Sequence, residues 1–212
     1  MFAALVSAVL FCSAVDAQTA SSATPTAGPA KQVYYGLVVD NSGSLRTQLE
    51  IITDIVKDVV ADNGADDQAF LIRFISSDKI SLRQDFTTDK ELLNDAADAM
   101  YIEGGHTAML DAINIAADHF AARNDIPATA AKALLVITDG DDRESSSRVD
   151  DLLAKLKKSE IRVFAIGVSD LKVETKLLDK LTKGTGGKLI LYRRRDAAQT
   201  AAKEVAAAMR AR

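Results

Sequence analysis

The sequence has few of the residues that most often reveal a function: one cysteine, two histidines and no tryptophan among 212 residues. It also lacks an excess of positive charge, since the formal net charge is -4 and charges of both signs are interspersed. This pattern offers no positively charged surface for nucleic acid, so we expect that nucleic acid is not a partner. After the N-terminal residues 1–17, no stretch is long and apolar enough to resemble a transmembrane helix, so we expect no membrane span in the mature chain.

The N-terminal residues 1–17 form a short apolar run that ends in Val15, Asp16 and Ala17. The run is too short to span a bilayer comfortably and ends in a small-residue cleavage pattern, which predicts a signal peptide. Cleavage after Ala17 removes Cys12, the only cysteine, and so excludes disulfides and thiol chemistry. We therefore expect a secreted or periplasmic protein.

Residues 18–31 are rich in Ser, Thr, Ala, Pro and Gly and have no apolar periodicity, which predicts a flexible linker. Residues 32–212 then alternate strand and helix patterns and form the predicted domain. The expected strands are Val33–Val39, Ala69–Ile75, Ile80–Phe86, Ala133–Thr138, Ile161–Val168 and a short one within 186–192. The first expected helix has an apolar stripe that runs from Leu45 to Val59. The other expected helices are Leu92–Met100, Ala108–Arg123, 149–160, 173–184 (ending at Gly184) and Asp196–Arg210.

Strands that alternate with helices imply crossover connections and a mostly parallel sheet. The segment ALLVIT, which ends at Thr138, has the unbroken apolar character of a strand buried on both faces. The polar turn SSDK between the second and third strands indicates a hairpin, and therefore one antiparallel edge strand. The sequence thus predicts a three-layer α/β/α, Rossmann-like fold.

Polar residues follow the strands of this predicted sheet. Asp40, Ser42 and Ser44 come directly after the first strand, Asp139 follows ALLVIT, and Thr107 starts the helix that leads towards that strand. Ligands of such sheets bind outside the carboxyl ends of the strands, where all five side chains can converge. Carboxylates and hydroxyls are hard oxygen ligands, which favour Mg²⁺, Mn²⁺ or Ca²⁺. Alternate spacing along an extended loop, with a permissive glycine at position 43, lets the first three point the same way.

The segment DNSGS matches the pattern DxSxS. Together with the Thr of GGHT and the Asp of TDGDD, in this order, it resembles the metal-ion-dependent adhesion site of von Willebrand factor type A domains, with all ligand positions filled. The resemblance implies that Ser42, Ser44 and Thr107 bind one divalent cation directly, Mg²⁺ being the first expectation, while Asp40 and Asp139 act partly through water. It implies that the open position takes a Glu or Asp from a partner protein. The phrases LVVDNSGS and LLVITDGDD are most similar to exported bacterial members, including the acidobacterial group.

The same residues have plainer interpretations. Ser44 suits the N-cap of a strand-to-helix turn, and Thr107 suits the N-cap of its own helix, a role compatible with metal binding. Asp141, Asp142 and Glu144 extend the acidic loop, for which a solvated surface is favoured over a second cation site.

Enzyme interpretations fit less well. A haloacid-dehalogenase-type phosphatase needs a second carboxylate two residues after its first, where this chain has Ser42. A serine hydrolase needs a base beside its nucleophile and a GxSxG elbow, which the surroundings of Ser42 do not match. Its base could only be His106, expected at the rim of the metal face, or His119, expected to have a structural or surface role. GTGGK at 184–188 precedes a strand, unlike a phosphate loop. We therefore expect a non-enzymatic, metal-dependent protein-binding module. The alternatives are a metal-dependent phosphohydrolase and a structural domain with a vestigial metal site.

Overall fold

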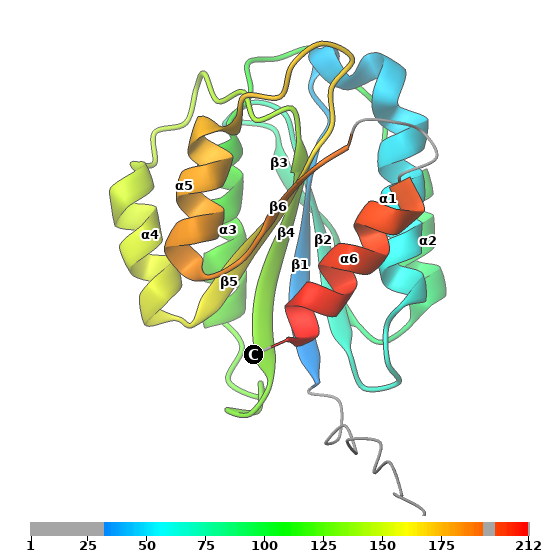
Figure 1. Cartoon of the computed structure of the whole chain (residues 1–212), viewed down its shortest axis with the longest axis vertical. Coiled ribbons are helices and arrows are strands. Elements are labelled where there is room, and N and C mark those ends of the chain that lie inside the picture. The colour runs from blue at the N-terminus through cyan, green and yellow to red at the C-terminus, as the bar shows by residue number, and fades with distance from the viewer. Residues whose placement is uncertain (1–31, 193–197, 212) are drawn as a thin grey trace, which may run out of the picture.

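The computed structural model describes residues 32–192 and 198–211 (Figure 1). The strands are β1 (Val33–Asp40), β2 (Gln68–Phe74), β3 (Ile80–Thr87), β4 (Ala131–Thr138), β5 (Ile161–Gly167) and β6 (Leu189–Leu191). The helices are η1 (Gly43–Gln48), α1 (Leu49–Ala61), α2 (Lys90–Asp98), α3 (Met109–Ala121), α4 (Val149–Lys158), α5 (Thr175–Thr185) and α6 (Ala198–Arg210). The predicted signal peptide 1–17, the linker 18–31 and the predicted helix start at Asp196 lie outside the described residues.

The elements form three layers, as predicted from the sequence. Helices α1, α2 and α6 cover one face of the sheet, and α3, α4 and α5 cover the other (Figure 1). The central strand β1 contributes Leu37 and Val39 to the first core and Tyr34 and Val38 to the second. Burial of both faces of a strand requires apolar side chains at consecutive positions, which explains the continuous apolar runs in the sequence.

The sheet has the strand order β3-β2-β1-β4-β5-β6. All neighbouring strands are parallel except β2 and β3, which form the predicted antiparallel hairpin at one edge. From β1 the chain first builds outwards to β2 and β3 and then returns to place β4 on the other side of β1. The strand order therefore reverses between β1 and β4, and their carboxyl ends define the switch point at which open α/β sheets bind ligands.

The end of α5 differs from the prediction. The helix continues through Gly184 to Thr185, and Gly186, with a left-handed φ of 75°, ends it. Gly184 has a packing role instead, because an added Cβ there would lie 2.7 Å from the side chain of Leu153 on α4. The prediction was wrong because the sequence offered two nearby glycines, and only the contact with α4 distinguishes them.

The start of α2 also differs. The helix begins at Lys90, before the predicted Leu92, because the side chain of Asp89 caps it by accepting hydrogen bonds from the backbone amides of Glu91 and Leu92. Within the described ranges, none of the helices is both long and apolar enough to cross a membrane.

Candidate metal centre

The carboxyl ends of β1 and β4 bring two of the predicted ligands to the switch point of the sheet. Asp40 is the last residue of β1, and Asp139 directly follows β4, the neighbouring parallel strand. The two strands are joined at this edge by a hydrogen bond of 2.6 Å from the hydroxyl of Thr138 to Oδ2 of Asp40. The predicted placement of both carboxylates at one edge is confirmed.

Residues Asp40 to Ser44 form a loop that we call the DxSxS loop. Oδ1 of the buried Asp40 accepts a hydrogen bond of 2.9 Å from the backbone amide of Ser42. The hydroxyl oxygens of Ser42 and Ser44 lie 3.1 Å apart. Burial raises the pKa of Asp40 to about 7, although hydrogen bonds from Thr138 and Ser42 oppose the shift. A bound cation favours the charged form of such a carboxyl group.

The backbone of this loop is not extended throughout, as the sequence had suggested. Ser42 is extended, with φ of -70° and ψ of 162°, but the 3-10 helix η1 begins at Gly43. Ser44 therefore lies inside η1 and is not its N-cap, and the tight 3-10 turn brings its hydroxyl towards that of Ser42. Gly43 has no positive φ; among the described residues the glycines with that geometry are Gly140 and Gly186.

The connection from α2 to α3, residues 99–108, carries Thr107, and we call it the Thr107 loop. The amide of Ala108 donates to the carbonyl oxygen of Ile75 at 3.0 Å, which fixes the loop to the end of β2. The carbonyl oxygen of Thr107 accepts from the amides of Arg143 at 2.9 Å and Glu144 at 3.1 Å. Thr107 is buried, yet its hydroxyl forms no hydrogen bond within the described part of the chain. This hydroxyl is therefore available to a ligand.

Thr107 is not the N-cap that the sequence predicted. The N-cap position of α3 is Ala108, whose side chain cannot accept a hydrogen bond. Asp142 supplies the cap from the loop after β4, because its Oδ1 accepts from the amides of Met109 at 2.8 Å and Leu110 at 3.4 Å. The prediction that Asp142 is merely a solvated acidic residue was wrong. No sequence signal indicated this cap, because Thr107, directly before Ala108, offered a local one.

A second carboxylate strengthens the same connection. Asp111, in the first turn of α3, accepts hydrogen bonds from the backbone amides of Ser146 at 3.0 Å and Ser147 at 2.8 Å. The first turn of α3, directly after the Thr107 loop, and residues 139–148, which we call the Asp139 loop, are therefore joined by side chains in both directions. Together with the hydrogen bonds from the amides of Arg143 and Glu144 to the carbonyl oxygen of Thr107, these contacts attach Thr107 to the Asp139 loop.

Gly140, next to Asp139, shapes the other side of the Asp139 loop. Its φ is 83°, and an added Cβ would collide with the carbonyl oxygen of Glu174. The amide of Glu174 in turn donates to the carbonyl oxygen of Asp139 at 2.8 Å. The close approach that places Asp139 thus requires glycine at position 140, a requirement that sequence reasoning missed although the glycine follows the carboxylate directly.

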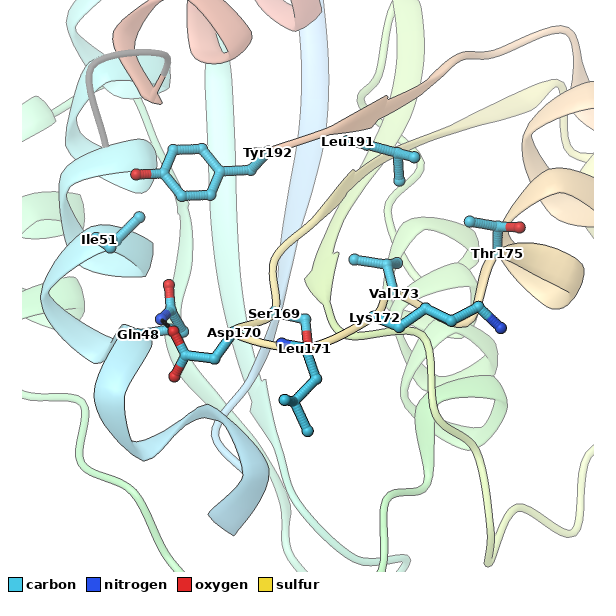
Figure 2. Close-up of a pocket in the computed structure, with 10 residues that line it drawn as sticks. All are labelled: Gln48, Ile51, Ser169, Asp170, Leu171, Lys172, Val173, Thr175, Leu191 and Tyr192. Atoms are coloured by element: carbon cyan, nitrogen blue, oxygen red, sulfur yellow. Dashed lines mark hydrogen bonds between the residues drawn. The ribbon is translucent and has the colours of Figure 1, made fainter. Parts of the chain in front are cut away.

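A pocket of about 680 Å³ lies between the start of α1, the connection from β5 to α5 and the end of β6. Figure 2 shows the side chain of Asp170 beside Gln48 at one side of this pocket. The carboxylate of Asp170 accepts hydrogen bonds from the side chains of Thr47 and Gln48. Because both donors belong to η1, this connection anchors the 3-10 helix that carries Ser44.

The side chains at the switch point fit a hard divalent cation. They offer two carboxylates and three hydroxyls and no nitrogen or sulfur donor, the set that Mg²⁺ and Ca²⁺ accept. The described residues contain no group of three or more His, Cys, Asp or Glu side chains that could hold a metal ion. A cation at this edge must therefore use the hydroxyl oxygens in addition to Asp40 and Asp139.

The two histidines have different surroundings. His106 is exposed on the Thr107 loop, consistent with a place at the rim. His119 stacks on Phe86, with ring centroids 5.3 Å apart, and forms a hydrogen bond of 2.9 Å with Asp85. These contacts of a side chain that is 22% exposed agree with the structural or surface role expected for His119.

Comparison with known proteins identifies the fold. The family model described as von Willebrand factor type A domain matches residues 36–205, while no curated protein matches the chain. The conserved hypothetical protein BatB from Bacteroides thetaiotaomicron is similar, with 19% identity, a TM-score of 0.67, and coverage of 84% of this chain and 98% of that chain. Proximal thread matrix protein 1 from the mussel byssus has 20% identity and a TM-score of 0.70, with coverage of 83% and 47%.

A third similar structure is the pilus adhesin SpaC from Lactobacillus rhamnosus GG. It has 16% identity and a TM-score of 0.63, and the similarity covers 84% of this chain and 30% of the adhesin. At such low identities these likenesses show the fold alone.

Proposed function

Because the chain belongs to the von Willebrand factor type A domain family, we propose that it is a protein-binding module that holds one divalent cation and uses it to capture an acidic side chain of a partner. Domains of this family generally act in interaction or adhesion rather than as enzymes. A pilus adhesin and a thread matrix protein are among the similar structures, and both descriptions suit a binding role. In this proposal the protein acts outside the cytoplasm, secreted or in the periplasm, as its apolar N-terminus suggests.

The observation that supports the proposal is the position of Asp40 and Asp139 at the carboxyl ends of the neighbouring strands β1 and β4, with the hydroxyls of Ser42 and Ser44 together on the loop that follows β1. In the proposal, Ser42, Ser44 and Thr107 bind the cation directly through their hydroxyls, and Asp40 and Asp139 supply its charge complement, partly through water. A bound cation supplies an open coordination position for a carboxylate. Since three of the five side chains are neutral hydroxyls, the cation stays electrophilic and can accept a further carboxylate.

The phosphohydrolase alternative is not favoured. Such an enzyme needs an acid or base beside the first carboxylate, and position 42 holds a serine whose hydroxyl contacts Ser44. We propose that the cation connects two proteins and that no bond is made or broken.

The test is calorimetric titration of the full chain, stripped with EDTA, with Mg²⁺, Mn²⁺ and Ca²⁺. We expect one site in the wild type, no binding in Ser42→Ala and Asp40→Ala, and wild-type binding in Asp141→Ala. Asp141 is the matched control because it lies in the Asp139 loop but forms an ion pair at 2.5 Å with the exposed Arg143. Circular dichroism checks that each variant keeps its fold.

The same titration with an added acidic peptide tests the open position, and a phosphomonoester panel tests for turnover. We expect the peptide to tighten cation binding and the panel to remain unreacted. No cation binding with or without peptide, or steady turnover that Asp40→Asn abolishes, would overturn the proposal.

A further inference from the structure

Arg73 is a charged residue inside the protein, near the carboxyl end of β2. Its side chain is only 7% exposed. The residues before it on the same face of the strand, Ala69 and Leu71, belong to the apolar core beneath α1, α2 and α6. A guanidinium in such a place is costly unless its nitrogens are paired.

The pairing of Arg73 is incomplete. Its Nη2 lies 3.7 Å from Oε2 of Glu103, a distance too long for a hydrogen bond. Its guanidinium carbon lies 4.2 Å from the centre of the Tyr101 ring, which makes a cation–π contact. Nε and Nη1 have no hydrogen-bond partner among the described residues. Local stability therefore does not account for a positive charge at this position, because an apolar side chain of similar size fills the space at a lower cost.

Both partners of Arg73 lie on the Thr107 loop, at the point where that loop contacts the DxSxS loop. The side-chain amide of Asn41 donates to the carbonyl oxygen of Tyr101 at 3.3 Å. The backbone amide of Glu103 donates to the carbonyl oxygen of Asn41 at 3.1 Å. Asn41 stands between Asp40 and Ser42, so the segment that Arg73 contacts is bonded directly to the backbone of the DxSxS loop.

We propose that Arg73 is a positioning residue: it holds residues 101–103 against Asn41 and thereby sets the separation between the DxSxS loop and Thr107. Its effect on cation binding rests on the proposed function, whereas its effect on the loop does not. Arg73 contacts none of the five oxygen donors in this scheme and acts through Tyr101 and Glu103.

Three variants of the full chain test the proposal. Arg73→Met keeps the apolar length of the side chain and removes the charge, and Arg73→Lys keeps a positive charge near Glu103. Arg162→Met is the matched control, because Arg162 makes a similar contact with an aromatic ring, 5.2 Å from Phe164, but lies at the opposite end of the sheet and donates to carbonyl oxygens of α6.

The metal-free readout is amide hydrogen exchange measured by NMR. In Arg73→Met the Glu103 amide should exchange about five- to thirtyfold faster, the range that a lost cation–π contact gives. Amides of β1 should be unchanged, and Arg73→Lys should recover part of the protection. The thermal midpoint of Arg73→Met should equal or exceed that of the wild type, since Glu103 is 35% exposed and keeps its ion pair with Lys79. Arg162→Met should lower the midpoint without affecting Glu103.

The second readout is titration with Mg²⁺, for which we expect Arg73→Met to bind about five- to thirtyfold more weakly and Arg162→Met to bind like the wild type. Unchanged exchange at Glu103 would overturn the proposal, as would faster exchange throughout the domain with a lower midpoint, which indicates a merely structural role. Tighter Mg²⁺ binding in Arg73→Met would also overturn it. If the wild type binds none of Mg²⁺, Mn²⁺ and Ca²⁺, with or without the acidic peptide, the proposed function fails, and exchange at Glu103 alone decides the role of Arg73.

Discussion

Replacing Asp142 by alanine should destabilise the domain, because the start of α3, 33 residues earlier in the chain, loses its capping side chain. Oδ1 of Asp142 accepts hydrogen bonds from the amides of Met109 and Leu110 and, at 2.6 Å, from the hydroxyl of Ser145. In Asp142→Ala the two amides lose their partner, because the N-cap residue Ala108 has no acceptor in its side chain. The loss therefore resembles the removal of a helix cap.

The expected magnitude follows from that comparison. Removing a capping side chain costs about 0.5–2 kcal/mol, and we place this case near about 1.5 kcal/mol because two amides and a hydroxyl lose one acceptor together. For a domain of this size, such a change lowers the thermal midpoint by about 3–6 °C.

Thermal unfolding followed by circular dichroism measures this effect directly. Asp142→Asn, which keeps the Oδ1 acceptor, should retain most of the wild-type stability. Asp141→Ala, which removes only a surface ion pair with Arg143, should change the midpoint by less than about 2 °C. Equal midpoints for Asp142→Ala and the wild type, or equal losses in Asp142→Ala and Asp141→Ala, would refute the reasoning that the cap comes from the Asp139 loop.

Two further predictions concern stability. Gly140→Ala should lower the free energy of unfolding by about 3 kcal/mol or more, and Gly186→Ala by about 1 kcal/mol. Both glycines have a positive φ, but of the two only Gly140 has backbone atoms where an added Cβ would lie. Equal losses of stability in chemical denaturation would contradict this. The amide of Phe86 and, to a lesser extent, His119 hold the pKa of Asp85 below its usual range. A lowered carboxyl pKa gives stability that is complete above the unfolded value and is lost as pH falls through the folded value. Asp85→Asn should therefore melt below the wild type at about pH 7 and converge with it at about pH 2, whereas a pH-independent difference would exclude the mechanism.

The layers of the fold could be predicted because their cause is local. A strand buried on both faces, such as β1 or β4, must be apolar at nearly every position, and the helices between strands show their own period. The end of α5 could not be predicted, since the choice between Gly184 and Gly186 depends on Leu153, a residue of another helix. Helix ends are set by such contacts as much as by propensity.

In the candidate site, too, features with a local cause could be predicted, and features that depend on other segments could not. Asp40 and Asp139 could be found because each follows a buried strand, and parallel strands bring their ends together. The roles of Asp142 and Arg73 could not be found, because their partners lie on other segments; Asp142 caps a helix that starts 33 residues earlier. Metal binding by the five predicted residues stays a prediction that the titration decides.

The position of β1 between β2 and β4 has a consequence for the synthesis of the chain. The ribosome completes β1, β2 and β3 before β4 emerges, and the hydroxyl that bonds Asp40 belongs to a residue 98 positions later. Throughout this interval one edge of an apolar strand is unpaired and open to other nascent chains. A pause in translation between β3 and β4 should therefore increase aggregation, whereas a pause after β4 should not.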